Sequence, residues 1–302
     1  MPDLSIIVVN YNTGELLREC VKSVYEKIND ISFEVIVVDN ASRDGSIVLL
    51  KQKFPSLVLI ENKNNRGFAA ANNQALELSR GTYILFLNPD TKIISGSFHD
   101  LIDFAGKNED LGALGVKLLN SDASLQLSCR KFPSLKSVAR QMFFQDKKNY
   151  EKLGNYDQPR EIDQPMGAAL LARKSVLDKI GGFDERFFLY YEEVDLCKRI
   201  KEADWKIYFY PGISVMHYGC VCAFQNYAKN IEENYRSLYK YFYKHYGIFD
   251  VFLVKLITTA GICIRILILA VNGVLPIKNK GIREAEMRLK GYFLLLFKNL
   301  FL

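Results

Sequence analysis

Two short acidic stretches of this sequence place carboxylates where they can do chemistry. In "YILFLNPDT" the apolar run 83–87 is followed directly by Asn88, Pro89 and Asp90, and in "YYEEVDLC" Glu192 stands beside Glu193. Adjacent carboxylates raise each other's pKa, which suits a general base. A carboxylate that directly follows a buried strand lies at the edge of an open α/β sheet where ligands bind. Both stretches are therefore candidate parts of an active site.

The elements that must position these carboxylates repeat along the first 95 residues. Four apolar runs, each ending in polar residues, are expected to be strands, and they cover 4–12, 33–42, 57–62 and 83–87. The segments between them carry apolar residues at helical spacing or small residues. Alternating strands and helices predict a parallel sheet covered by helices on both faces. The polar residues at the strand ends then converge on one edge of that sheet.

The second half of the chain contains a longer patterned segment, from Gly167 to Ile200. It reads as a strand of small residues, then a short helix that stops at Gly181–Gly182, then a turn. A second helix begins with the acidic residues at 192, 193 and 195. Carboxylates in a first helical turn are often only caps and dipole partners, and for Asp195 this interpretation is as good as a functional one.

A dinucleotide-binding domain is the main alternative for the first half. Such a domain needs G-x-G-x-x-G in the first turn between strand and helix, so that the backbone approaches a pyrophosphate. Here that turn reads "VVNYNTGELL", with one glycine. The sequence therefore argues against a nicotinamide oxidoreductase.

The charge and the cysteines indicate the surroundings in which the protein works. The 302 residues carry a net charge of +6 and are 49% hydrophobic, which is enough for a large core. Most of the charge asymmetry lies in a basic tail from Lys278 onward, beside apolar residues, which favours an anionic membrane surface over nucleic acid. The six scattered cysteines and a start that leads directly into a strand predict reduced thiols in the cytosol and no signal peptide.

The segment after Tyr246 changes character. Residues 251–271 are long and apolar enough for a bilayer span, but Lys255 and Arg265 interrupt them. A charge at mid-bilayer costs about 2.5 to 3.5 kcal/mol, so we expect helices lying in the membrane interface, together with "GYFLLLFKNLFL" at 291–302. The alternatives are a true span and helices that close the protein's own core or a dimer interface.

Seven blocks of the sequence, taken together, resemble the family 2 glycosyltransferases, and among them bacterial rhamnosyltransferase-like enzymes that build cell-surface polysaccharides. The blocks are "VVNYN", "VVDNASRDGS", "NRGFAAANNQA", "LFLNPDT", "GAALLAR", "GGFDERFFLYYEEVDLC" and "YPGISVMHYG", in the order of that family. The resemblance covers about residues 4–245. It implies a GT-A fold, a mostly parallel Rossmann-like sheet flanked by helices, an inverting mechanism and a nucleotide-diphosphate sugar donor.

The resemblance also implies which residues bind the donor. They are Asn10, Tyr11, Asn12 and Asp39 for the base and ribose, Arg66 and Gly67 in a turn facing the diphosphate, and Asn88 with Asp90. A carboxylate can accept the N–H of a nucleotide base, and an arginine pairs well with phosphate.

By the same resemblance, "NPD" corresponds to the aspartate motif that binds a divalent cation, Mn²⁺ or Mg²⁺. Asn88 stands where an aspartate often does, so Asp90 is left as one carboxylate, and His217 of "SVMHYG" would complete the metal site. The implied catalytic base is Glu193, where the family commonly has Asp. Glu192 is the second candidate, and Asp195 a supporting group.

The hypothesis from sequence is an inverting glycosyltransferase that acts at the cytoplasmic face of the cell membrane, as a peripheral or monotopic protein. Its acceptor would be a lipid-linked or polysaccharide glycan, and its donor dTDP-rhamnose, with a UDP-hexose as the alternative. A catalytically inactive GT-A protein that serves as a membrane scaffold is a further alternative. The expected domains are a transferase domain 1–246, with a nucleotide-binding half 1–95 and an acceptor half 96–246, and a hydrophobic, basic extension 247–302.

Overall fold

The structure is a computed structural model that describes residues 1–144, 156–219, 227–273, 291–293 and 295–296. The chain forms two compact units. The first comprises 1–132, 150–188 and 192–222, and the second comprises 133–149, 189–191 and 223–302. Two of the six cysteines, Cys220 and Cys222, and most of the predicted basic tail from Lys278 onward lie outside the described residues.

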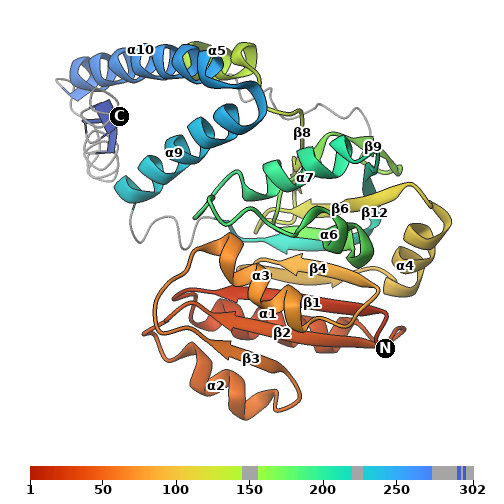
Figure 1. Cartoon of the computed structure of the whole chain (residues 1–302). Coiled ribbons are helices and arrows are strands. Elements are labelled where there is room, and N and C mark those ends of the chain that lie inside the picture. Colours follow the sequence, from red (N-terminus) through yellow and green to blue (C-terminus); the bar gives the residue numbers. More distant parts are fainter. Residues whose placement is uncertain (145–155, 220–226, 274–290, 294, 297–302) are drawn as a thin grey trace. The chain divides into compact units, whose positions relative to one another are not determined.

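The first half of unit 1 is the predicted alternation of strands and helices (Figure 1). In chain order its elements are β1 (Leu4–Asn10), α1 (Glu15–Lys27), β2 (Phe33–Asp39), α2 (Ser46–Lys53), β3 (Val58–Glu61), α3 (Phe68–Leu78) and β4 (Tyr83–Leu87). Strands β3, β2, β1 and β4 are neighbours in that order and all parallel. The prediction of a parallel sheet is thus confirmed for these four strands.

The second half of unit 1 extends the same sheet with mixed directions. Its elements are β5 (Thr91–Ser95), α4 (Phe98–Lys107), β6 (Leu111–Leu119), β7 (Leu125–Gln126), β8 (Cys129–Arg130), β9 (Arg160–Ile162), β10 (Gln164–Pro165), β11 (Ala169–Arg173), α6 (Lys174–Ile180), α7 (Glu192–Glu202) and β12 (Lys206–His217). The sheet continues from β4 as β11, β6, β12 and β5, with β11 antiparallel to both of its neighbours. Strands β8 and β10 form a separate small sheet.

Alternation of side chains along each strand produces two hydrophobic cores, one on each face of the sheet. In β1, for example, Leu4, Ile6 and Val8 join one core while Ile7 and Val9 join the other. Helices α1, α2 and α4 supply the first core, and α3, α6 and α7 supply the second. Strands buried on both faces need apolar residues at every position, which explains the continuous apolar runs in the sequence.

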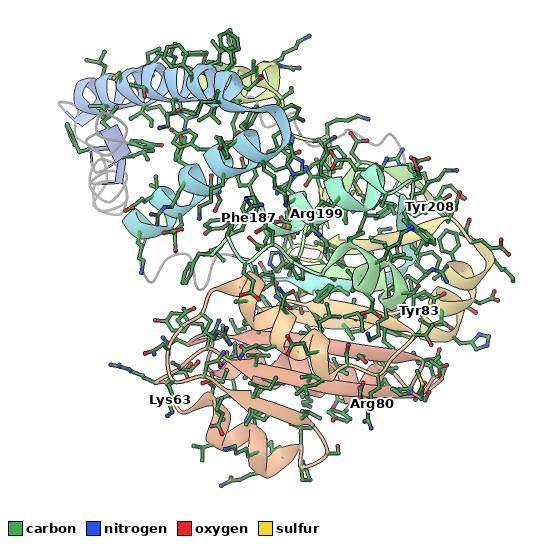
Figure 2. The ribbon with its side chains drawn as sticks, in the orientation of Figure 1. Lys63, Arg80, Tyr83, Phe187, Arg199 and Tyr208 are labelled. Atoms are coloured by element: carbon green, nitrogen blue, oxygen red, sulfur yellow. The ribbon has the colours of Figure 1, made fainter. Side chains whose placement is uncertain are left out.

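The two edges of the parallel strands differ in character (Figure 2). At the amino edge, Arg80 before β4 donates to Glu34 of β2 through both its side chain and its backbone N–H, and these contacts link the starts of two strands that lie on either side of β1. Lys63 follows β3 at the opposite, carboxyl edge. The carboxyl edge is where the sequence places its polar residues.

Unit 2 is helical in the part of it that the structure describes. Helices α5 (Leu135–Phe144), α9 (Tyr227–Tyr246) and α10 (Ile248–Gly273) pack together, with Val138, Met142, Tyr241 and Val254 buried. A Cβ on Gly261 of α10 would lie 2.7 Å from Met142 of α5, so the small residue allows these two helices to approach closely. Helix α10 from Ile248 to Ile268 is long and apolar enough to cross a membrane.

Candidate active site

The carboxyl end of β1 and β2 holds a buried polar network. Asn10 is fully buried, and its amide Nδ2 donates to Asp39 Oδ1 at 2.8 Å, Ser42 Oγ at 3.0 Å and Ser46 Oγ at 3.1 Å. The other carboxylate oxygen of Asp39 accepts the backbone N–H of Ser42 at 3.0 Å. A carboxylate oxygen can accept more than one hydrogen bond, so Asp39 keeps acceptor capacity for a ligand. The network fixes the orientation of this side chain.

The residues that follow β1 form a tight turn over this network. Asn12 has a positive φ of 51°, a conformation that asparagine tolerates better than most residues. Its backbone N–H donates to Ser42 Oγ and its side-chain oxygen accepts the N–H of Arg43 at 2.7 Å. Tyr11, in contrast, is 40% exposed, so its ring is accessible at the carboxyl edge.

The predicted donor turn, Arg66–Gly67, precedes α3. The side chain of Asn40 after β2 donates to the Gly67 carbonyl at 3.0 Å, which joins the turn to the carboxyl edge of the sheet. Gly67 has φ of 86°, and a Cβ there would lie 2.7 Å from Phe188. The Arg66 side chain is exposed and forms no hydrogen bond or ion pair with the described residues. Its guanidinium is therefore available to an anion.

Asp90 and His217 are brought together by strand pairing. Strand β5 begins directly after Asp90 and runs antiparallel to β12, with Thr91 opposite His217. The backbone N–H of Tyr218 donates to the Asp90 carbonyl at 3.0 Å, which extends this pairing by one residue. As a result His217 Nε2 lies 3.5 Å from Asp90 Oδ1, and the two side chains are only 12% and 10% exposed.

These two side chains suit a divalent cation that takes further ligands from its substrate. In the described part of the chain, no group of three or more His, Cys, Asp or Glu residues is arranged to hold a metal ion. A carboxylate oxygen and an imidazole nitrogen facing each other are nonetheless a usual donor set for Mn²⁺. Donor phosphates and water supply the remaining ligands in many nucleotide sites. The Asn88 side chain forms no hydrogen bond with the described residues, while its backbone N–H donates to the Ala168 carbonyl.

The two adjacent glutamates at the start of α7 have different environments. Glu192 is 6% exposed and its Oε2 has no hydrogen-bond partner among the described residues, whereas Glu193 is half-buried. Burial, and next the negative charge of Glu193, raise the pKa of Glu192 well above its usual value. Burial also raises the pKa of Glu193, but the positive charge of Arg130 and the backbone N–H of Gly167 favour its ionised form. Of the two carboxyls, Glu193 is thus the one that ionises more readily.

Glu193 lies close to the end of β4 because of strand β11. The segment leading into β11 passes Asn88, whose N–H donates to the Ala168 carbonyl at 2.9 Å. A Cβ on the preceding residue, Gly167, would lie 3.1 Å from Glu193 Cγ. Gly167 and Ala168 therefore connect the "NPD" turn to the glutamate pair.

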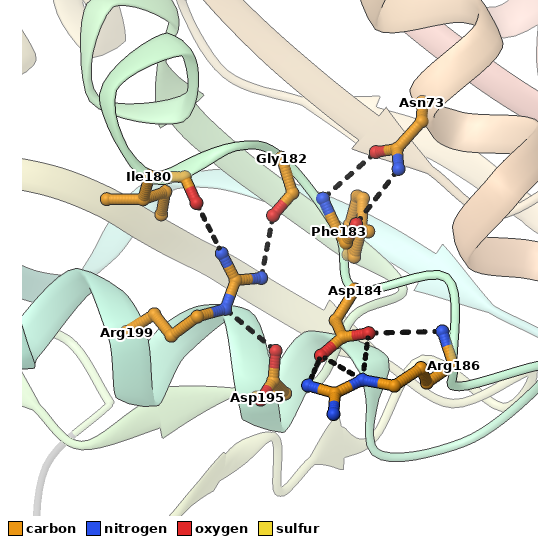
Figure 3. A network of polar contacts seen from close by, with 8 residues as sticks. All are labelled: Asn73, Ile180, Gly182, Phe183, Asp184, Arg186, Asp195 and Arg199. Carbon is orange, nitrogen blue, oxygen red and sulfur yellow. Dashed lines mark hydrogen bonds and ion pairs between the residues drawn. The ribbon is translucent and has the colours of Figure 1, made fainter. Parts of the chain in front are cut away.

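Asp195, the third acidic residue of α7, is fully buried and paired with an arginine (Figure 3). Arg199 donates to Asp195 Oδ2 at 2.8 Å, to the Ile180 carbonyl at 3.0 Å and to the Gly182 carbonyl at 2.6 Å. This arginine ties the first turn of α7 to the loop that follows α6. The geometry gives Asp195 a structural partner.

Asn73 of α3 holds the same loop from the other side (Figure 3). Its side-chain oxygen accepts the Phe183 N–H and its amide donates to the Phe183 carbonyl, both at 2.9 Å. The backbone N–H of Phe68 also donates to the Phe188 carbonyl at 2.7 Å. The donor turn and the loop before the glutamates are thus one connected structure.

Four residues around the site carry no recognisable signal in the sequence. Asn73, Gln126, Arg130 and Gly167 contact candidate site residues, or act on their charge, across large separations along the chain. Asn73 and Gly167 belong to quoted motifs, but their spacing to Phe183 and Glu193 does not reveal the contacts. Strand register determines these neighbours.

Comparison with known proteins gives the family and the fold. A sequence model described as "Glycosyl transferase family 2" matches residues 5–181. A protein of Mycobacterium tuberculosis named N-acetylglucosaminyl-diphospho-decaprenol L-rhamnosyltransferase is 26% identical over 254 residues, covering 78% of this chain and 82% of that protein. The rhamnosyltransferase WbbL of Escherichia coli is 28% identical over 228 residues, covering 70% of this chain and 82% of that protein.

Among solved structures, the mannosyltransferase PcManGT from Pyrobaculum calidifontis, in complex with GDP-Man and Mn²⁺, superposes with a TM-score of 0.58. The alignment covers 99% of this chain and 87% of that one at 18% identity. This similarity confirms the predicted GT-A fold.

Proposed function

The chain belongs to glycosyl transferase family 2 and is a glycosyltransferase, and from that premise we propose that it transfers a sugar with inversion from a nucleotide-diphosphate donor to a lipid-linked acceptor. Rhamnose is the preferred sugar and dTDP-rhamnose the preferred donor. The observation that carries this choice is the similarity, over most of both chains, to two proteins named as rhamnosyltransferases. One of those names specifies a diphospho-decaprenol acceptor, which is the chemical class proposed here.

The donor would lie along the carboxyl edge of the sheet. Asp39 accepts an N–H of the nucleotide base, Tyr11 offers an exposed ring, and Arg66 donates to the diphosphate. Asp90 and His217 would hold a divalent cation, Mn²⁺ in preference to Mg²⁺ because of the imidazole ligand, and that cation would supply positive charge to the diphosphate. The 3.5 Å separation of the two side chains and their near-complete burial support this assignment.

Glu193 acts as the general base. Its carboxylate takes the proton of an acceptor hydroxyl while the hydroxyl oxygen forms a bond to the anomeric carbon of the donor sugar. The bond between that carbon and the diphosphate oxygen breaks, and its electron pair leaves with the nucleoside diphosphate. A base with a raised pKa holds the proton more firmly, which favours this step. Partial exposure of Glu193 leaves it accessible to an acceptor.

The experiment measures donor binding and transfer on the same preparations. The substrates are dTDP-rhamnose or a UDP-hexose and an N-acetylglucosaminyl-diphospho-polyprenol acceptor, with and without Mn²⁺. We expect Glu193→Gln to retain donor binding while transfer falls about a hundredfold or more. Asp90→Ala should abolish the metal-dependent part of donor binding, and His217→Ala should weaken it.

Glu202→Gln, at the other end of α7, is the control and should leave both measurements unchanged. Transfer near the wild-type rate in Glu193→Gln would move the base to Glu192. A preference for the UDP-hexose would refute the choice of donor. Inversion can be tested by assigning the new linkage as α or β by NMR.

We also propose that α10 rests on the cytoplasmic face of a lipid bilayer, as a peripheral or monotopic attachment. The exposed side chains of this helix within its described part are all uncharged and form one stripe, which consists of Ile248, Phe249, Phe252, Leu256, Ala260, Cys263, Ile264, Leu267 and Ile268. At a rise of about 1.5 Å per residue the stripe is roughly 30 Å long. A surface of this length and composition suits lipid chains.

The two positively charged side chains inside α10 have partners within unit 2. Lys255 lies over the Tyr239 ring, 5.7 Å from its centre, and Arg265 donates to the Gln141 carbonyl of α5 at 2.7 Å. Neither cation is on the exposed stripe. This arrangement keeps both cations off the exposed face, and it favours a helix lying on the bilayer with one face held by protein.

Cys263 provides the test, because it is the exposed cysteine of those that the structure describes. After Cys220→Ser and Cys222→Ser, an environment-sensitive fluorophore on Cys263 should shift to the blue on vesicles of phosphatidylglycerol and phosphatidylethanolamine. Phe252→Glu with Leu256→Glu should prevent the shift. A blue shift without vesicles, accompanied by dimer formation, would instead make the stripe a contact between two copies of the chain.

A further inference from the structure

Gln126 contacts the far side of the His217 ring. The amide oxygen Oε1 of Gln126 lies 2.9 Å from His217 Nδ1, and both side chains are part-buried. Gln126 is on β7, a two-residue strand that pairs antiparallel with β6. Strand β6 is in turn the neighbour of β12, the strand that ends at His217. Nothing in the proposed transfer reaction requires this contact, so its purpose is a separate question.

The orientation of the Gln126 amide is fixed by two acceptors. Its Nε2 donates to Asn120 Oδ1 at 3.0 Å and to the backbone carbonyl of His217 at 3.4 Å. A backbone carbonyl only accepts hydrogen bonds, so the NH₂ group must face it. The amide oxygen then faces the imidazole, and Nδ1 of His217 must carry the proton that this oxygen accepts.

That proton decides what His217 presents to Asp90. In a neutral imidazole with Nδ1 protonated, Nε2 has a free electron pair, and it points toward Asp90 Oδ1 at 3.5 Å. The 3.5 Å separation leaves room for a cation that both atoms contact.

We propose that Gln126 is a positioning residue that holds His217 in its Nδ1–H form and directs Nε2 toward the cation shared with Asp90. Ligating histidines commonly donate their second nitrogen to an oxygen in this way, which orients the ring and raises the basicity of the ligand. Asn120 in turn holds Gln126. The inference rests on the proposed function, since it takes Asp90 and His217 as the cation site.

The test combines the tautomer with metal affinity and does not use turnover. The protein has three histidines, so ¹⁵N-labelled imidazole spectra of the metal-free protein are assignable with His99→Gln and His245→Gln. We expect the Nδ1–H form for His217 in wild type and its loss in Gln126→Ala. Binding of Mn²⁺ in the presence of UDP or dTDP, followed by electron paramagnetic resonance, should weaken about 10- to 100-fold in Gln126→Ala.

Two further variants separate positioning from general damage. Gln126→Glu keeps an oxygen for Nδ1–H and should restore Mn²⁺ affinity to within a few-fold of wild type. Leu125→Ala alters the neighbouring residue of β7, which points to the other face of the strand, and should change neither reading. Unchanged Mn²⁺ affinity in Gln126→Ala would overturn the inference alone. Absence of Mn²⁺ binding in wild type, despite an Nδ1–H tautomer, would overturn the cation site and this inference with it.

Discussion

Arg199 should be the most costly single side chain of α7 to remove. Asp195 has no exposed surface and the Arg199 side chain is 16% exposed, so the pair is almost fully desolvated. Arg199→Met removes the charge that compensates Asp195 and also two hydrogen bonds to the Ile180 and Gly182 carbonyls. Breaking one partner of a buried pair costs about 3–5 kcal/mol. We therefore expect the free energy of unfolding of unit 1 to fall by about that amount.

A double-mutant cycle separates the ion pair from the two carbonyl bonds. Asp195→Asn removes the negative charge, so the double variant Asp195→Asn/Arg199→Met no longer buries an uncompensated carboxylate. It should be about 2 kcal/mol more stable than the sum of the single effects predicts. Lys198 and Glu202 form the matched control, because they have the same i,i+4 spacing on the same helix but are 26% and 49% exposed. Breaking that pair should cost less than about 0.5 kcal/mol.

Urea unfolding followed by tryptophan fluorescence provides the assay. The chain has one tryptophan, Trp205, which follows α7 and packs against the core that α7 helps to form. Its signal therefore reports on the region where the pair lies. A loss below about 1 kcal/mol in Arg199→Met, or an equal loss in the control pair, would refute the reasoning. If Asp195→Asn folds stably yet transfers no sugar, Asp195 has a catalytic role in addition to its structural one.

Two further predictions concern the glutamate pair. The pKa of Glu192 is raised in the folded state, so the folded protein binds this proton more tightly than the unfolded chain does. The stability of the protein should therefore fall as pH rises from the usual pKa of 4.5 toward the raised pKa of the folded state. Glu192→Gln should reduce this loss of stability, so the melting temperature of the variant minus that of wild type should increase between pH 4 and pH 8. A difference in melting temperature that stays constant with pH would contradict this prediction. Gly167→Ala brings a Cβ to 3.1 Å from Glu193 Cγ and must displace that side chain by a few tenths of an ångström. We expect kcat to fall severalfold with donor affinity unchanged, and a loss of donor affinity would show a wider distortion.

The parallel strands could be predicted because their burial is visible in the residues themselves. Strands β1, β2 and β4 are apolar at nearly every position, and the polar residues directly after them mark where the backbone leaves the core. The predicted ends of β1, β2 and β3 lie one to three residues beyond the observed ends. After β1 and β2 the reason is that "NYN" and "NAS" contain no turn signal such as glycine or proline. The convergence of Asn10, Asp39 and Asp90 on one edge then follows from parallel topology alone.

The pairing of the second half could not be predicted, because it depends on strand order. Residues 91 and 217 are opposite each other only since β12 lies antiparallel to β5. A two-residue strand such as β7 has no periodicity to detect, so the contact between Gln126 and His217 is invisible in the sequence. The same holds for Arg265, whose partner carbonyl belongs to a helix more than 120 residues earlier.

The glutamate pair shows most clearly what a sequence leaves open at a site. Two neighbouring glutamates are equivalent by type and by spacing, and either one fits the role of base. The structure separates them: within the described part of the chain Glu192 has a buried oxygen without a hydrogen-bond partner, while Glu193 has Arg130 and the Gly167 N–H beside it. Two coupled carboxyls share their protons according to which one is better stabilised as an anion. As pH rises the proton therefore remains longer on Glu192, and Glu193, on the partly exposed side, is the first of the two to ionise.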